Sequence, residues 1–122
     1  MERRTRQRSA IQDVVNGAPR PLSAAEIHEL ADERLTGIGI ATIYRTIKSL
    51  IDSGEVVTVA LPGDTPRYER AALGHHHHFH CRTCGRVFEM HGCPKNLAQL
   101  APSGFEVDGH EVVLYGKCRT CA

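Results

Sequence analysis

The sequence predicts an α+β fold in two parts: three helices followed by a β-hairpin, then a small α/β unit. In the first half, apolar residues recur at three- and four-residue steps, which is the spacing of amphipathic helices. After residue 54, short β-branched runs alternate with Gly and Pro turns, as they do in paired strands. A chain of 122 residues can form one average domain or two small units.

The first two helices are predicted from apolar stripes and capping residues. Residues 5–16 carry Ile and Val on one side, with Thr5 as N-cap and Gly17 as the stop. A Pro-Arg-Pro loop follows, and residues 23–26 (SAAE) have the capping-box pattern that begins a second helix. The apolar stripe of this helix ends near Gly37.

The third helix and the hairpin complete the first part. Residues 41–53 place isoleucines and a leucine on one face, and Gly54 ends the helix. Two extended runs, 55–61 and 66–70, flank a Pro-Gly-Asp turn and predict a two-stranded hairpin. Three helices followed by a hairpin make a winged helix-turn-helix.

The second part begins after a small-residue hinge. We predict a winged-helix domain over 1–70, a hinge over 71–74 and a small α/β domain over 75–122. Within the last of these, the histidine-rich segment and the returning RVFEM segment form paired strands. Pro94 begins a short helix, and the FEVD and HEVVLY segments are extended.

Composition limits the class of protein. The net charge is +1, so bulk charge does not indicate a nucleic-acid binder, although four arginines gather near the N-terminus. The chain has three Phe, three Tyr and no Trp, so we expect metal or oligomerisation to add stability. We expect a cytoplasmic protein, because neither a long apolar run nor a secretory signal is found.

Four of the five cysteines form two C-x-x-C pairs. Cys81 with Cys84, and Cys118 with Cys121, would supply the closed tetrahedral shell of a structural zinc ion. In a reducing compartment, metal ligation is favoured over disulfides. An iron–sulfur centre, a redox-active pair and unligated thiols are the alternatives.

The HHHHFHC segment concentrates metal ligands on a predicted strand. Because alternate side chains of a strand leave on opposite faces, two metal sites could grow from one strand. One face would carry His76, His78 and His80, and the other His75, His77 and Cys81.

The sequence resembles the ferric uptake regulator family, especially its zinc-uptake-regulator branch. The matching segments, in family order, are TRQRSAI, SAAEIH, IGIATIYRTIKSL, HHHHFHCRTCG and HEVVLYGKC, followed by the final C-x-x-C. The resemblance implies a winged helix joined by a hinge to a dimerisation domain. It also implies a dimeric repressor that binds palindromic double-stranded DNA operators, with its sensing metal as corepressor.

The resemblance implies two regulatory metal sites. The sensing site would take Glu69, His76, His78 and Glu89. The second site would take His75, His77 and His110 with an acid, near whose position Cys93 falls; Cys93 is either a thiolate ligand or a small buried residue. A Cys-His shell would favour Zn²⁺ over Fe²⁺ or Mn²⁺. His80 and His91 have no assigned role.

The chain departs from its relatives at two positions. Pro21 stands where iron- and peroxide-sensing relatives bring a histidine, and Ala71 where zinc-sensing relatives often have a hinge cysteine. The first departure argues against an iron or peroxide sensor, and the second argues against a simple zinc-uptake assignment. We expect a zinc sensor, with an iron or peroxide sensor as the alternative within the family. A zinc-binding interaction module or metal chaperone is the alternative of another class, and an enzyme is not expected.

DNA contacts are expected from the third helix and from basic residues around it. Arg45 suits bidentate contact to guanine, and Tyr44 suits a phosphate or a thymine methyl. Basic side chains elsewhere would add phosphate contacts that weaken with salt. The predicted DNA-binding residues are Thr42, Tyr44, Arg45, Lys48, Arg4, Arg6, Arg8 and, beside the hairpin turn, Arg67.

Overall fold

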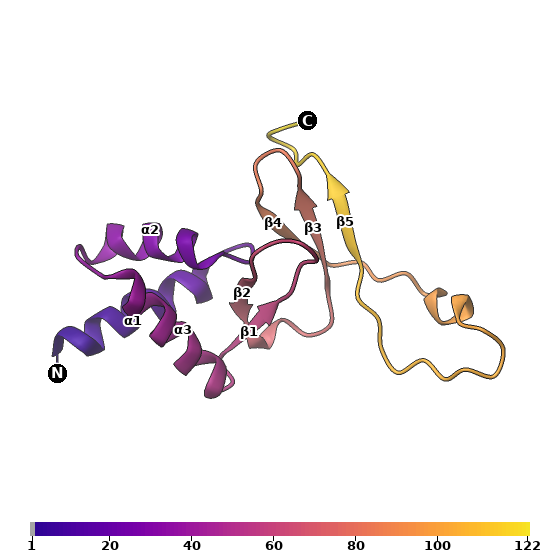
Figure 1. Ribbon diagram of the computed structural model, residues 1–122, viewed down its shortest axis with the longest axis horizontal. Coiled ribbons are helices and arrows are strands. Elements are labelled where there is room, and N and C mark those ends of the chain that lie inside the picture. The colour runs from indigo at the N-terminus through magenta and orange to yellow at the C-terminus, as the bar shows by residue number, and fades with distance from the viewer. Residues whose placement is uncertain (1) are drawn as a thin grey trace. The chain divides into compact units, whose positions relative to one another are not determined.

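The computed structural model describes residues 2–122 and divides into two compact units (Figure 1). The first unit ends at Gly74, and the second runs from His75 to Ala122. Within residues 2–122, no helix has both the length and the apolar character needed to cross a membrane.

The first unit is a winged helix, as predicted. Its elements are α1 (Glu2–Gly17), α2 (Ala24–Arg34), α3 (Ile40–Asp52), β1 (Val56–Val59) and β2 (Arg67–Arg70). β1 and β2 pair antiparallel, and Leu22 exchanges two backbone hydrogen bonds with Tyr68 of β2, at 3.0 and 2.8 Å. These two bonds fix the hairpin beside the start of α2.

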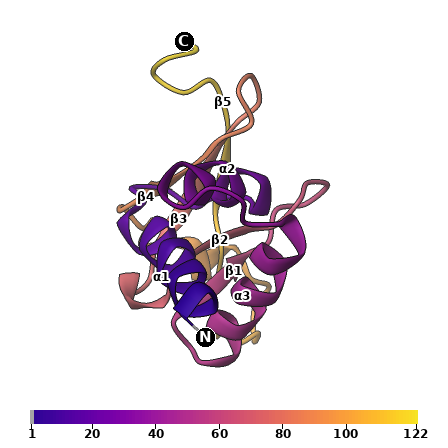
Figure 2. The same ribbon diagram turned by 90° about the vertical axis from the view of Figure 1, so that its left-hand side faces the viewer.

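Aliphatic side chains from all three helices form the core of this unit. Figure 2 shows the ribbons of these three helices gathered beside β1 and β2. Ile11, Ile27, Ile43 and Leu50 are fully buried. Each such side chain contributes about 1.5–3 kcal/mol relative to an exposed one. The opposite face of α3 stays in solvent, because its apolar residues are concentrated on one side.

The N-termini of α1 and α2 test the capping residues predicted from the sequence. The capping box is confirmed: Ser23 Oγ accepts the Glu26 N–H at 3.1 Å, and the Ser23 N–H donates to Glu26 Oε1 at 3.0 Å. The N-cap predicted at Thr5 is wrong, because α1 already begins at Glu2. Arginine and glutamine are good helix formers, so the ERRTRQR stretch continues the helix through Thr5.

The second unit is a three-stranded sheet. β4 (Val87–Met90), β3 (His77–Cys81) and β5 (Val113–Gly116) lie in that order; β3 pairs antiparallel with β4 and parallel with β5. The predicted strand pair is confirmed. The helix predicted from Pro94 reduces to one 3₁₀ turn, Leu97–Leu100, and no strand forms at FEVD.

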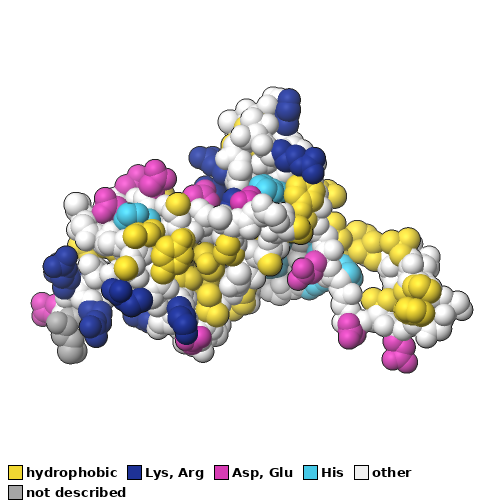
Figure 3. All heavy atoms as spheres, in the orientation of Figure 1, with side chains coloured by type: hydrophobic (Ala, Val, Ile, Leu, Met, Phe, Trp, Pro, Cys, Tyr) yellow, Lys and Arg dark blue, Asp and Glu magenta, His cyan; other side chains and the backbone are white. Residues whose placement is uncertain are grey.

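The segment 94–109 between β4 and β5 extends into solvent. Leu100 is 81 % exposed and Phe105 is 70 % exposed, and Val107 is also exposed. Figure 3 shows hydrophobic side chains gathered on this segment at the right of the view. A helix could not be stabilised here, because these side chains have no core of their own unit to pack against.

Candidate metal centres and nucleic-acid interface

Two cysteine turns meet at one end of the second unit's sheet. Cys81 ends β3, and its Sγ accepts the N–H groups of Cys84 and Cys118, both at 3.4 Å. Cys84 Sγ lies 3.9 Å from Cys118 Sγ, and the four sulfurs, including Cys121, lie within 4.8 Å of one another. Four sulfurs at about 2.3 Å from one zinc ion would be about 3.8 Å apart. The donor set therefore fits a tetrahedral metal ion.

The electrostatics of this cluster favour thiolates that require a cation. The N–H groups of Cys84 and Cys118 lower the pKa of Cys81 to about 6, and the Cys121 N–H lowers the pKa of Cys118. The side chain of Cys118 raises the pKa of Cys121 to about 12. The raised pKa of Cys121 means that a further negative charge in the cluster is unfavourable without metal, and a divalent cation would offset that repulsion.

A second cluster forms around His77, which begins β3. Cys93 Sγ lies 3.2 Å from His110 Nε2 and 3.4 Å from His75 Nε2. His110 Nε2 lies 3.2 Å from His77 Nε2, and all four donor atoms lie within 4.8 Å of one another. Three imidazoles and one thiol therefore point at a common centre, spaced as ligands of one tetrahedral zinc ion are.

His77 connects this cluster to the sheet. Its side chain is buried, and burial, followed by the charges of His75 and His110, lowers its pKa, so the ring stays neutral. The Val112 N–H donates to His77 Nδ1 at 3.1 Å, which places the ring proton on Nε2. Metal binding through Nε2 would displace that proton to Nδ1 and release Val112, which immediately precedes β5.

The other face of β3 carries the remaining histidines. The rings of His76 and His78 lie edge to face at 4.8 Å, and Glu89 of β4 is the residue paired with His78. The His80 ring lies 5.7 Å from that of Tyr115. Glu69 lies on β2 in the first unit, paired with Val57.

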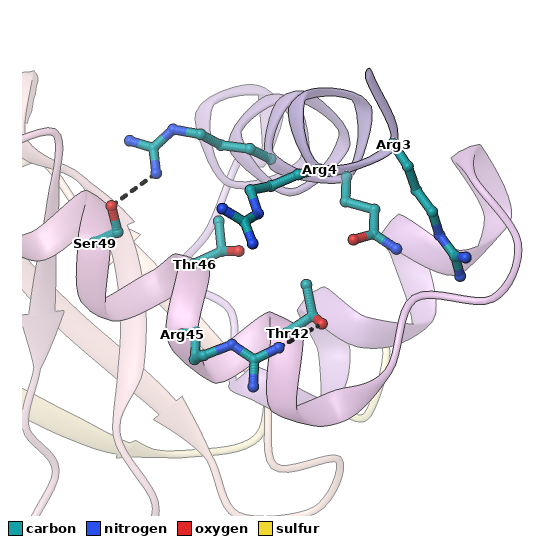
Figure 4. A pocket seen from close by; sticks show the side chains of 8 residues that line it. Arg3, Arg4, Thr42, Arg45, Thr46 and Ser49 are labelled. Carbon is teal, nitrogen blue, oxygen red and sulfur yellow. Dashed lines mark hydrogen bonds between the residues drawn. The ribbon is translucent and has the colours of Figure 1, made fainter. Parts of the chain in front are cut away.

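An open basic groove lies between α1 and α3 in the first unit. Its volume is about 890 Å³. Figure 4 shows Arg3 and Arg4 of α1 facing Thr42, Arg45, Thr46 and Ser49 of α3 across it. Arg45 donates to Thr42 Oγ1 at 3.1 Å, and Arg8 donates to Ser49 Oγ at 2.8 Å. The groove concentrates positive charge that the net charge of the chain conceals.

The other predicted DNA-binding residues lie around this groove. Arg6 is exposed on α1 but does not line it. Lys48 is exposed and lies 3.5 Å from Asp52. Tyr44 is 55 % exposed and borders a separate hollow beside the hairpin and the start of α2.

The position of Arg67 differs from the one predicted. It was expected to contact phosphate from the wing, but its side chain is buried. Its Nη1 donates to the Thr65 carbonyl at 2.6 Å, and its guanidinium lies near Asp64 and Glu26. Arg67 therefore fastens the hairpin turn to α2 and does not offer its charge to DNA.

Sequence reasoning missed the polar residues that share the groove with the arginines. Gln7, Thr46 and Ser49 line it. Thr46 and Ser49 lie on the polar side of α3, which the helical period could have indicated. Only the crossing of α1 over α3 shows that this side faces the arginines.

Comparison with known proteins identifies the family. The sequence model of the ferric uptake regulator family matches residues 2–115. The chain belongs to the ferric uptake regulator family. Its members are metal-responsive transcriptional regulators, and this chain is one of them.

Particular relatives span nearly the whole chain. The zinc uptake regulation protein of Mycobacterium tuberculosis (strain CDC 1551 / Oshkosh) is 35% identical, over 98% of this chain and 94% of the relative. The ferric uptake regulation protein of Brucella suis biovar 1 is 36% identical, over 93% and 82%. The crystal structure of FurB from M. tuberculosis, a zinc uptake regulator, has a TM-score of 0.55 and 32% identity, covering 99% and 96%.

Proposed function

We propose that this chain is a zinc-responsive repressor that binds a palindromic operator as a homodimer, with zinc as corepressor. The carrying observation is the cluster of Cys93 with three histidines, whose donor atoms already converge. A thiolate with imidazoles suits zinc, whereas Fe²⁺ and Mn²⁺ prefer shells richer in oxygen. Overall sequence identity does not distinguish the sensed metal, because a zinc regulator and a ferric regulator are 35% and 36% identical to this chain.

The four-cysteine cluster would hold a structural zinc ion in the same protein. All four ligands come from one unit; Cys81 is fully buried, Cys118 and Cys121 are half-buried, and Cys84 is exposed. A closed four-thiolate shell stabilises a fold and leaves no open position for catalysis.

The sensing site would join ligands from both sides of the hinge. We assign it Glu69, His76, His78 and Glu89 from the family resemblance, supported by the pairing of His78 with Glu89. A bound metal can promote DNA binding only if it binds the DNA-competent arrangement more tightly than the alternative. Ligands on both sides of a hinge supply such a preference.

The basic groove supports the DNA-binding part of the proposal. Arg45 would read base edges from α3, while Arg4 and Arg8 of α1 would contact the phosphate backbone. Tyr44, Thr42, Lys48 and Arg6 would extend this surface along α3 and α1. Such a regulator acts on cytoplasmic DNA.

The test is operator binding as a function of free metal. Starting from protein that retains its four-cysteine metal, zinc in the nanomolar range or below should raise operator affinity at least tenfold, whereas Mn²⁺ and Fe²⁺ at the same free concentration should not. His78→Ala should abolish the response, and His91→Ala, an exposed histidine outside both clusters, should keep it. Equal responses to Fe²⁺ and Zn²⁺ would contradict the zinc assignment.

A second measurement separates a repressor from a metal-carrying interaction module. Arg45→Ala should lose operator affinity while its zinc stoichiometry stays unchanged. If the wild-type chain binds zinc fully and shows no operator preference at any zinc concentration, the repressor assignment is wrong.

A further inference from the structure

Cys93 and His110 stand at the two ends of the exposed segment 94–109. Sixteen residues separate them, yet Cys93 Sγ lies 3.2 Å from His110 Nε2. Both side chains point at the cluster that His75 and His77 present from the sheet. The cluster therefore joins the two ends of the segment 94–109. We call this junction of Cys93 with His110 the neck of the segment.

Little else in the segment holds it closed. Its backbone hydrogen bonds are local: they join Gln99 to Asn96, Ala101 to Ala98 and Phe105 to Pro102. Its large apolar side chains are exposed, so they contribute little packing. These bonds do not cross between the two ends, so the cluster is the contact that joins Cys93 to His110, in addition to the pairing of β4 and β5 with β3 on either side of the segment.

Cys93 is also a chemically accessible member of the cluster. Its side chain is exposed, as is that of Cys84 in the four-cysteine cluster, whereas Cys81 is buried. Two imidazole nitrogens lie within 3.4 Å of its sulfur, and a metal ion there would hold it as a thiolate. A thiolate is both the ligand and the nucleophile, and susceptibility to oxidation follows thiolate character together with exposure.

We propose that Cys93 is an oxidation site for hydroperoxides, and that its oxidation releases the metal of this cluster and opens the segment 94–109. The proposal rests on the proposed occupancy of the cluster by zinc. The thiolate sulfur attacks one peroxide oxygen, the O–O bond breaks, and the alcohol or water leaves after taking a proton. Sulfur is oxidised by two electrons to the sulfenic acid, and the peroxide is reduced by two.

The product explains the loss of metal. A sulfenic acid is a far poorer zinc ligand than a thiolate, so the centre would fall from four protein ligands to three imidazoles. The neck would then lose its only ligand from the Cys93 end. A thiol reductant would restore the thiolate and the site.

The test compares the full-length wild-type protein with Cys93→Asp, in which a carboxylate keeps a ligand that peroxide does not oxidise. Zinc-loaded proteins would be treated with cumene hydroperoxide at a low molar excess. The wild type should gain one oxygen atom at Cys93 by peptide mass spectrometry and release one more zinc ion per chain than the variant. Its segment 94–109 should gain hydrogen exchange, and a thiol reductant should reverse all three changes.

The number of zinc ions bound before oxidation tests separately whether the second cluster holds zinc and whether Cys93 is the oxidation site. Before oxidant, His110→Ala should bind one zinc fewer than the wild type, and equal counts would remove the second site and the inference together. If that difference is present but peroxide releases equal zinc from the wild type and Cys93→Asp, the site stands and the redox inference is wrong. Loss of zinc only from the four-cysteine cluster, with Cys93 unmodified, would overturn it as well.

Discussion

Cys84 and Cys118 are 34 positions apart in the sequence, yet their sulfur atoms lie 3.9 Å apart. The contact joins the turn after β3 to the C-terminal turn after β5. The second unit has three short strands and few buried apolar side chains. A metal ion at this contact would therefore supply much of the stability that a core supplies elsewhere.

Removal of one of these ligands should unfold the second unit. In Cys118→Ser we expect loss of the cooperative unfolding of residues 75–122 and of at least one zinc ion per chain, that of the four-cysteine cluster. The zinc contribution is on the order of 10 kcal/mol in small zinc-dependent folds, which exceeds what this unit can replace. Metal analysis with circular dichroism checks this. Cys93→Ser is the matched control: it should lose zinc only from the second cluster and keep the fold.

Replacement of Arg45 should weaken operator binding without unfolding the protein. Arg45 lies on the solvent side of α3 and lines the basic groove. A bidentate base contact is worth about 1–3 kcal/mol, so Arg45→Ala should lose roughly 5- to 150-fold in affinity. Fluorescence anisotropy on specific and scrambled DNA measures the effect. Arg34→Ala, which removes an exposed arginine from the end of α2, should change affinity less than twofold.

Arg67 should matter for stability. Arg67→Gln removes a buried guanidinium from Glu26, Asp64 and the Thr65 carbonyl. Unpaired buried groups should cost about 1–3 kcal/mol of unfolding free energy, measured by urea denaturation. Arg70→Gln, an exposed change on the same strand, should cost less than about 0.5 kcal/mol. A normal unfolding curve for Arg67→Gln combined with a reduced salt dependence of DNA binding would reinstate Arg67 as a phosphate contact.

Glu26 should make the first unit sensitive to acid. Burial alone would raise the pKa of Glu26, but the Ser23 N–H and the Arg20 guanidinium at 2.7 Å together lower it below its ordinary value of 4.5. Because the folded-state pKa is depressed, the stabilisation is full above pH 4.5 and is lost as pH falls through the folded-state pKa. Chemical unfolding at pH 7 and at successive steps below pH 4.5 should show this decline. Glu26→Gln should be less stable at pH 7 and should show a smaller decline.

Local patterns in the sequence accounted for most of the elements. The three helices, the hairpin and the β3–β4 pair follow from periodicity, the capping box and turn residues. The short helix predicted from Pro94 forms only one 3₁₀ turn, because its apolar residues have no core to enter. Helix and strand signals describe what a segment can form, and packing decides whether it does.

Ligand types and their spacing were fixed by the sequence itself: two C-x-x-C turns, and histidines that alternate between the faces of one strand. Tertiary structure alone decided that Cys93 and His110 meet at the neck of an exposed segment, and that Arg67 is buried. The physical reason is the distance along the chain over which each interaction acts. Alternation along a strand and chelation within a turn act over a few residues, whereas convergence across the sheet depends on how distant segments pack.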